Sequence, residues 1–124
     1  MNVLATTLYP FVPSGSQFEL SLQFFATLGF EQQWRHEGLA GLRFGGAFFI
    51  LQDINVPEWQ QNQMIKFEVT DLDAYWAEIV AKDLPGRFSG VRLLQPTQFP
   101  WGREIHIIDP GGVCWHVRQA SPNA

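Results

Sequence analysis

The sequence contains a single cysteine, Cys114, among its 124 residues. No disulfide can therefore form within the chain and no CxxC metal-binding motif is possible, a pattern typical of the reducing cytoplasm. No apolar run approaches the roughly 18 residues needed to span a bilayer, and the N-terminus lacks the basic region of a signal peptide. We therefore expect a cytoplasmic protein without membrane partners.

Charged residues are also scarce, at 16% of the chain, and acidic ones outnumber basic ones to give a net charge of -4. Lysine and arginine do not cluster anywhere in the sequence. Sequence-independent binding to phosphates would be opposed by the net negative field. We therefore expect no nucleic-acid partner, and a neutral or cationic small molecule is the easier ligand.

Apolar residues are plentiful, at 46%, and predict one folded domain over residues 1–124. Residues 3–12 favour a strand, and Ser16 and Glu19 form a capping-box pattern that predicts a helix from about residue 17 to 28. Gly29 suits the left-handed residue that ends a helix. Three short strands should follow, over residues 31–36, 39–44 and 47–51.

The same pattern recurs after a polar segment, residues 56–63. A strand over 64–69 precedes a helix over 72–82 that Thr70 or Asp71 can cap, and a chain break is expected at Pro85-Gly86. A strand over 90–94 follows, and the turn Asp109-Pro-Gly-Gly joins the last two strands as a hairpin. The sequence thus predicts an α+β fold of two βαβββ modules, residues 1–57 and 63–120, joined by a short polar linker.

Four segments carry a family resemblance: PFVP at 10–13, FFATLGF at 24–30, KFEVTDLDAYWAEI at 66–79 and PWGREIHIIDPGG at 100–112. In this order they resemble the glyoxalase, bleomycin resistance and extradiol dioxygenase superfamily, also called vicinal oxygen chelate proteins. The resemblance implies that the sheets of the two modules curl into a cup around a cavity, usually in a homodimer. It is more specific for the fold than for the reaction.

Metal-using members of this superfamily place one ligand on the first and last strand of each module. By resemblance these positions fall at Pro10, Ile50, Met64 and His116. Only His116 is an ordinary ligand for a divalent ion, because Pro and Ile have no donor and a thioether is a soft ligand. Gln52 and His106 could join His116 only outside the family pattern. We therefore expect no metal and no other cofactor.

The chain most resembles the metal-free, bleomycin-resistance-like members. The resemblance places an aromatic ligand between Trp34 and Trp101, where two rings could stack on a flat group. The remaining expected ligand contacts are Ile50, Gln52, Met64, Glu104, His106 and His116. Trp76 and Trp115 are instead expected in the core or at a dimer interface.

Four functions remain open from the sequence. The first is metal-independent binding and sequestration of a small aromatic or cationic compound, which would give antibiotic or toxin resistance. The second is a metal-dependent lyase, isomerase or dioxygenase with a degenerate or displaced metal site. The third is a cofactor-free enzyme with His116 or Glu104 as the catalytic base. The fourth is a partner-binding module whose cup is filled by its own side chains.

Overall fold

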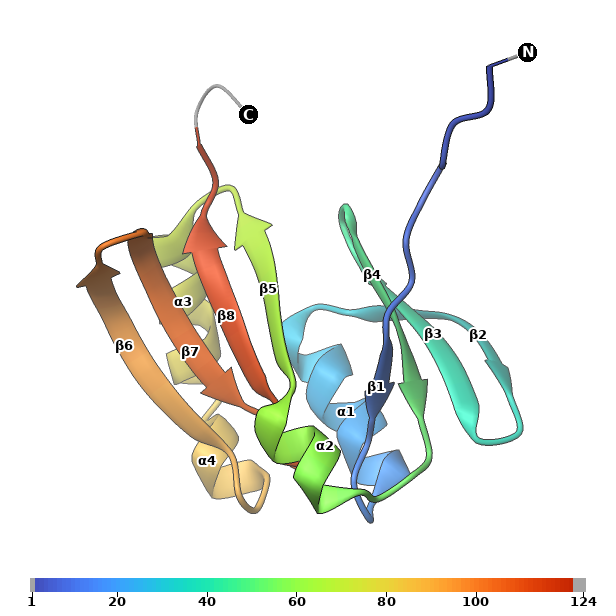
Figure 1. The fold of residues 1–124 in the computed structure, drawn as a ribbon. Coiled ribbons are helices and arrows are strands. Elements are labelled where there is room, and N and C mark those ends of the chain that lie inside the picture. Colours follow the sequence, from blue (N-terminus) through green and yellow to red (C-terminus); the bar gives the residue numbers. More distant parts are fainter. Residues whose placement is uncertain (1, 122–124) are drawn as a thin grey trace.

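The computed structural model describes residues 2–121 (Figure 1). The elements follow in the order β1 (Phe11–Pro13), α1 (Phe18–Leu28), β2 (Glu31–His36), β3 (Leu39–Phe44), β4 (Ala47–Gln52), α2 (Pro57–Asn62), β5 (Met64–Val69), α3 (Leu72–Ala81), α4 (Leu84–Arg87), β6 (Arg92–Phe99), β7 (Gly102–Ile108) and β8 (Cys114–Gln119). Within the described residues, no helix has the length and apolar character needed to cross a membrane.

Two four-stranded mixed sheets form the framework. Sheet A has the strand order β1-β4-β3-β2 and sheet B the order β5-β8-β7-β6. In each sheet the first and last strands of a module pair in parallel, and the other pairs are antiparallel. The predicted α+β fold with two βαβββ repeats is confirmed.

The ends of the main helices follow local sequence, with one exception. Gly29 ends α1 with φ of 117°, as expected. The side chain of Asp71 accepts a hydrogen bond from the Ala74 backbone N–H at 3.0 Å and so caps α3. The predicted capping box at α1 is wrong: Gln17 occupies the cap position without a side-chain hydrogen bond, and Glu19 forms an ion pair with Arg35 instead.

Several other boundaries differ from the predictions. Pro57 and Pro85 lie in the first turns of α2 and α4, where a missing N–H costs nothing, so short helices form where we expected a linker and a break. Strand β6 begins later than expected and continues to Phe99. Of the predicted first strand, only the end pairs with β4, and residues 2–9 form no strand (Figure 1).

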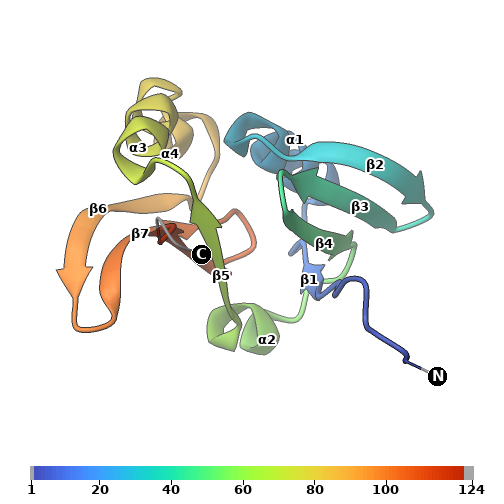
Figure 2. The ribbon, with the colours of Figure 1, turned by 90° about the horizontal axis from the view of Figure 1, so that it is seen from above.

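One aromatic core joins the two modules. Figure 2 shows α1, α3 and α4 on the same side of both sheets. On this side Trp115 of β8 lies buried, with ring centroids 4.9 Å from Phe49, 5.2 Å from Phe25 and 6.1 Å from Phe67. Because rings from both modules meet there, neither half has a complete core of its own. The core position expected for Trp115 is confirmed.

The modules also meet backbone to backbone. The hairpin turn between β7 and β8 packs on the segment after β1, so closely that a Cβ on Gly15 would lie 2.8 Å from the Gly111 Cα. The buried side chain of Gln60 in α2 donates a hydrogen bond to the Gly111 carbonyl at 2.8 Å. The turn, α2 and the first module are thereby fixed together.

Candidate functional site

The face of each sheet opposite the helices carries a row of side chains at equivalent positions. Register partners share a face, so each row can be followed across four strands. In sheet A the row is apolar and consists of Phe11, Ile50, Gly41 and Trp34. In sheet B it consists of Lys66, His116, His106 and Leu94. We call these the apolar row and the polar row.

A buried carboxylate, that of Glu104, lies beside the polar row. Glu104 is two residues before His106 on β7 and therefore projects to the same face, where it is 0% exposed. Its Oε1 lies 3.1 Å from His106 Nε2 and 3.1 Å from His116 Nδ1. Its Oε2 lies 2.8 Å from Lys66 Nζ. Three nitrogen groups thus surround one carboxylate.

These contacts keep Glu104 ionised. Burial alone would raise the pKa of Glu104, but interactions with Lys66, His116, His106 and Trp101 lower it to about 2. A carboxylate can only accept hydrogen bonds, so His106 must carry its proton on Nε2 and His116 on Nδ1. In the neutral rings the remaining lone pairs are on His106 Nδ1 and on His116 Nε2, and the latter faces the Cys114 thiol at 3.6 Å.

Aromatic rings extend the site from the histidines to the β6–β7 turn. The rings of Phe99 and Trp101 stack with centroids 5.0 Å apart, and Phe99 stacks on His106 at 5.1 Å. His106 in turn lies 4.2 Å from the His116 ring. A hollow of about 430 Å³ opens beside this stack, lined by Met64, Ile65, Lys66, Trp101 and His116. We call it the polar-row hollow.

The apolar row depends on a glycine. The Trp34 indole of β2 lies over Gly41, so a Cβ on Gly41 would lie 2.2 Å from the Trp34 Nε1. Trp34 remains 41% exposed above this position. The side chain is thus flat on the sheet and available to a ligand or partner.

Replacing Gly41 by Ala should displace Trp34 without unfolding the protein. The added methyl occupies the space of the indole, so the ring must rotate away from the sheet. Increased acrylamide quenching of Trp34 would report this, measured with Trp59, Trp76 and Trp101 replaced by Phe and with Trp115 kept, because its buried indole is shielded from the quencher. Gly46→Ala is the matched control, because a Cβ there meets nothing within 4 Å. Equal quenching of the Gly41 and Gly46 variants would contradict the prediction.

The structure brings together only part of the predicted ligand site. Glu104, His106, His116, Met64 and Trp101 gather on sheet B. By register, Ile50 and Trp34 lie instead on sheet A, where Gln52 shares a face with Ile50. Within one chain Trp34 does not face Trp101, because β2 and β6 are the far edges of different sheets (Figure 1).

Lys66 is the residue of this site that sequence reasoning missed. We placed Met64 at the position matching His116, but strand register pairs Lys66 with His116. The spacing from Phe11 to the start of α1 is one residue longer than the spacing from Lys66 to the start of α3, so the offset of the helices does not apply to the strands. The alternation of KFEV at 66–69 was the available signal. Because Phe67 is apolar and faces the core, Lys66 must project from the other face of the strand.

The metal of the resembling enzymes does not fit at the four corresponding positions. Register aligns Phe11, and not the expected Pro10, with Ile50, and it aligns Lys66, and not the expected Met64, with His116. Phe and Ile offer no donor atom, and the Lys66 ammonium is paired with Glu104. One histidine alone does not make a metal site at these positions.

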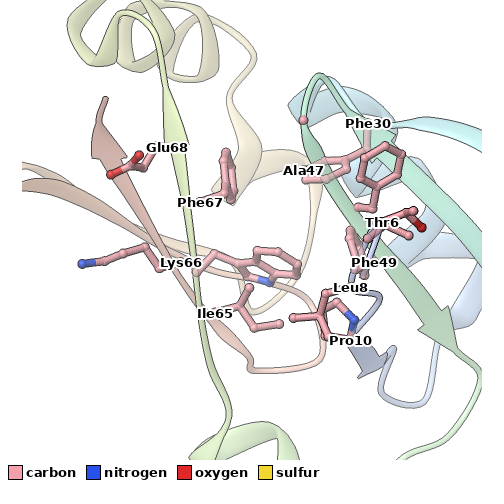
Figure 3. Close-up of a pocket in the computed structure, with 14 residues that line it drawn as sticks. Thr6, Leu8, Pro10, Phe30, Ala47, Phe49, Ile65, Lys66, Phe67 and Glu68 are labelled. Carbon is pink, nitrogen blue, oxygen red and sulfur yellow. The ribbon is translucent and has the colours of Figure 1, made fainter. Parts of the chain in front are cut away.

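A larger hollow, of about 840 Å³, lies between residues 6–10, β4 and β5 (Figure 3). Its walls are mostly apolar and include Phe30, Phe49 and Trp115. Figure 3 shows Ile65 and Phe67 directed toward Pro10 and Phe49, and Lys66 and Glu68 directed away. None of the eight predicted ligand residues lines it. We therefore place the candidate site on the polar row and interpret this hollow as the gap between modules.

No protein-family profile matches the sequence, and no curated protein matches it. Solved structures do match. A bleomycin-binding protein complexed with bleomycin gives a TM-score of 0.81 at 21% identity, over 94% of this chain and 100% of the other. The bleomycin-binding protein of Streptomyces verticillus complexed with copper(II)-bleomycin gives 0.75 at 24% identity, over 95% and 100%.

A third structure is the fosfomycin resistance protein FosX of Listeria monocytogenes, complexed with Mn(II) and sulfate. It gives a TM-score of 0.71 at 12% identity, over 98% of this chain and 94% of the other. At such identities the comparisons establish the fold and leave the function to the site itself. The chain has the fold of the glyoxalase, bleomycin resistance and extradiol dioxygenase superfamily, the vicinal oxygen chelate proteins.

Proposed function

We propose that this protein binds and sequesters a small aromatic cation without modifying it, and so confers resistance to an antibiotic or toxin. The observation that carries the proposal is the polar-row hollow, which is lined by the exposed ring of Trp101 and by Lys66 and His116, two residues that contact the buried, ionised carboxylate of Glu104. Two structural neighbours are bleomycin-binding proteins. Binding of this kind needs no metal at the four family positions.

Each part of the hollow has a role in this proposal. A flat ligand group stacks on Trp101, which is 53% exposed, for about 0.5–1.5 kcal/mol beyond the area it buries. A cationic group of the ligand takes the place of the Lys66 ammonium beside the buried Glu104 carboxylate, and the Lys66 side chain, which is 42% exposed, turns toward solvent. The net charge of -4 favours the approach of a cation.

We further propose a homodimer in which the apolar row of one copy faces the polar row of the other. The apolar row exposes Phe11 by 52% and Trp34 by 41% on an open sheet face. One chain cannot place Trp34 opposite Trp101, whereas a second copy can supply the missing ring. The lone cysteine is consistent with the cytoplasmic location that we propose.

Titration of bleomycin and of acridine orange, followed by tryptophan fluorescence in EDTA, tests the binding function. Both compounds should bind, and a neutral aromatic of similar size should bind more weakly. Trp101→Ala should weaken binding by about tenfold or more, the range of an aromatic hot spot. Trp59→Ala is the control, since Trp59 is 59% exposed in α2, outside the polar-row hollow. The proposal fails if no aromatic cation binds in EDTA.

The same titration tests the shared site when Trp34→Ala and Trp101→Ala proteins are mixed. A heterodimer of the two variants contains one site with both tryptophans and one with neither. The mixture should therefore regain tight binding at up to one site per heterodimer, although each variant alone binds weakly. A mixture that binds no better than the separate variants, with exchange of subunits verified by mass spectrometry, would rule out the shared site.

A further inference from the structure

We propose that Glu104, His106 and His116 form a binding site for a divalent first-row transition metal, distinct from the four positions that the resembling enzymes use. Only His116 belongs to both sets. The proposal goes beyond ligand sequestration and does not rest on it. It rests on the convergence of three donor atoms within the part of the chain that the structure describes.

The separations of the donor atoms suit a small metal ion. One ligand atom from each of the three residues lies within 4.8 Å of the other two. Glu104 Oε1 is 3.1 Å from His106 Nε2 and from His116 Nδ1. Donors at about 2.0–2.2 Å from a tetrahedral ion lie roughly 3.3–3.6 Å from one another. An ion can therefore enter with only small movements of the side chains.

The sheet holds the three donors in place. Glu104 and His106 are alternate residues of β7, and His116 is the register partner of His106 on β8. The Lys66 ammonium occupies Oε2 and leaves Oε1 directed at the two imidazoles, which favours a single bond from this carboxylate to the ion. His116 also lines the polar-row hollow, through which an ion and further ligands can reach the site.

Binding of the ion changes the tautomer of both histidines but releases no proton from them. Each neutral imidazole must move its proton to the nitrogen that does not bind the metal, and no proton is lost. His116 Nε2 then carries the proton and faces Cys114 Sγ at 3.6 Å, a weak acceptor. Two imidazoles and one carboxylate suit zinc or iron(II), whereas magnesium and calcium prefer oxygen ligands alone.

Titration of the EDTA-stripped and dialysed protein with Co²⁺ and Zn²⁺, without any organic ligand, tests the site. Co²⁺ should give visible absorption bands at one ion per chain, and calorimetry with Zn²⁺ should give the same stoichiometry. Glu104→Gln and His116→Gln should each weaken binding at least 10- to 100-fold, the range known for loss of outer-sphere partners alone. His36→Gln is the matched control, because His36 is exposed at the end of β2.

Lys66→Met separates metal binding from a merely structural role of the cluster. Removing the ammonium beside Oε2 removes a repulsive charge, so this variant should bind Zn²⁺ more tightly even though its fold is less stable. Nitrogen-15 spectra should also show that His106 and His116 each change to the other tautomer when Zn²⁺ is added. The site is refuted if neither ion binds below about 1 mM, or if the histidine and glutamate variants bind as the wild type does. Because ligand sequestration is tested in EDTA, either proposal can fail alone.

Discussion

Lys66→Met should lower the free energy of unfolding by about 2–3 kcal/mol at pH 7. Removing one partner of a fully buried ion pair costs about 3–5 kcal/mol, and the value here is smaller because the Lys66 side chain is 42% exposed. The loss arises at Glu104, which stays buried while the Lys66 ammonium that pairs with it is gone. Urea unfolding of the variant measures it.

Two further variants make this prediction specific. Glu104→Gln should cost less than Lys66→Met, because an unpaired lysine can turn to solvent and an unpaired buried carboxylate cannot. The double variant should recover part of the loss. The prediction is contradicted if Lys66→Met is as stable as the wild type. It is also contradicted if the double variant loses as much free energy of unfolding as the two single variants added together, because the ion pair would then not contribute to stability.

The same pair predicts how wild-type stability responds to acid. Its contacts hold the pKa of Glu104 at about 2 in the folded protein, below the ordinary value of 4.5. This stabilisation is fully present above about pH 4.5 and is lost as the pH falls toward 2. Acid unfolding monitored by circular dichroism should therefore become less steep in this range when Glu104 is replaced by Gln.

Trp115→Phe should cost about 2–4 kcal/mol, through a cavity in the shared core and a lost hydrogen bond. The Trp115 indole contacts rings of both modules, and its Nε1–H donates to the buried Asp109 Oδ2 at 2.9 Å. Phenylalanine fills less volume and leaves that oxygen without a donor. Trp59→Phe, at an exposed position, should change stability by less than about 0.5 kcal/mol and serves as the control.

The effect of Trp115→Phe should grow with pH. Burial raises the pKa of Asp109 to about 6, although hydrogen bonds from Trp115, Val113, Gly111 and Gly112 act against it. A raised carboxyl pKa means that ionisation opposes folding, so stability declines as the pH rises from about 3.8 to 6. Removing the indole raises this pKa further and extends the decline to higher pH. A loss that is constant from pH 4 to 8 would contradict this account.

The fold could be predicted from the sequence because its signals are local and repeated. Gly29 and Asp71 end and begin helices through backbone geometry that the residue type alone determines. The Asp109-Pro-Gly-Gly turn likewise joined two strands as expected. The predicted capping box at Ser16 and Glu19 does not form, and Glu19 instead pairs with Arg35, a residue distant in the sequence.

The site was only partly predictable, because strand register is not a local property. Alternation along β7 was enough to put Glu104 and His106 on one face. The place of Lys66 beside His116 depends on how far β5 slides along β8, and a difference of one residue between modules obscured it. Whether Trp34 can meet Trp101 depends on the arrangement of whole sheets, which neither residue type nor spacing encodes.

The contact between Gly15 and Gly111 has a mechanical consequence. Main-chain atoms of the two modules meet there, with a Cβ on Gly111 placed 2.6 Å from the Ser14 carbonyl oxygen, so neither glycine can carry a larger side chain without moving the modules apart. Together with the aromatic core around Trp115, this contact leads us to expect little change in the angle between the sheets. A bulkier compound cannot be admitted by opening the modules like a hinge, and the range of compounds that fit must change through the side chains of the two rows.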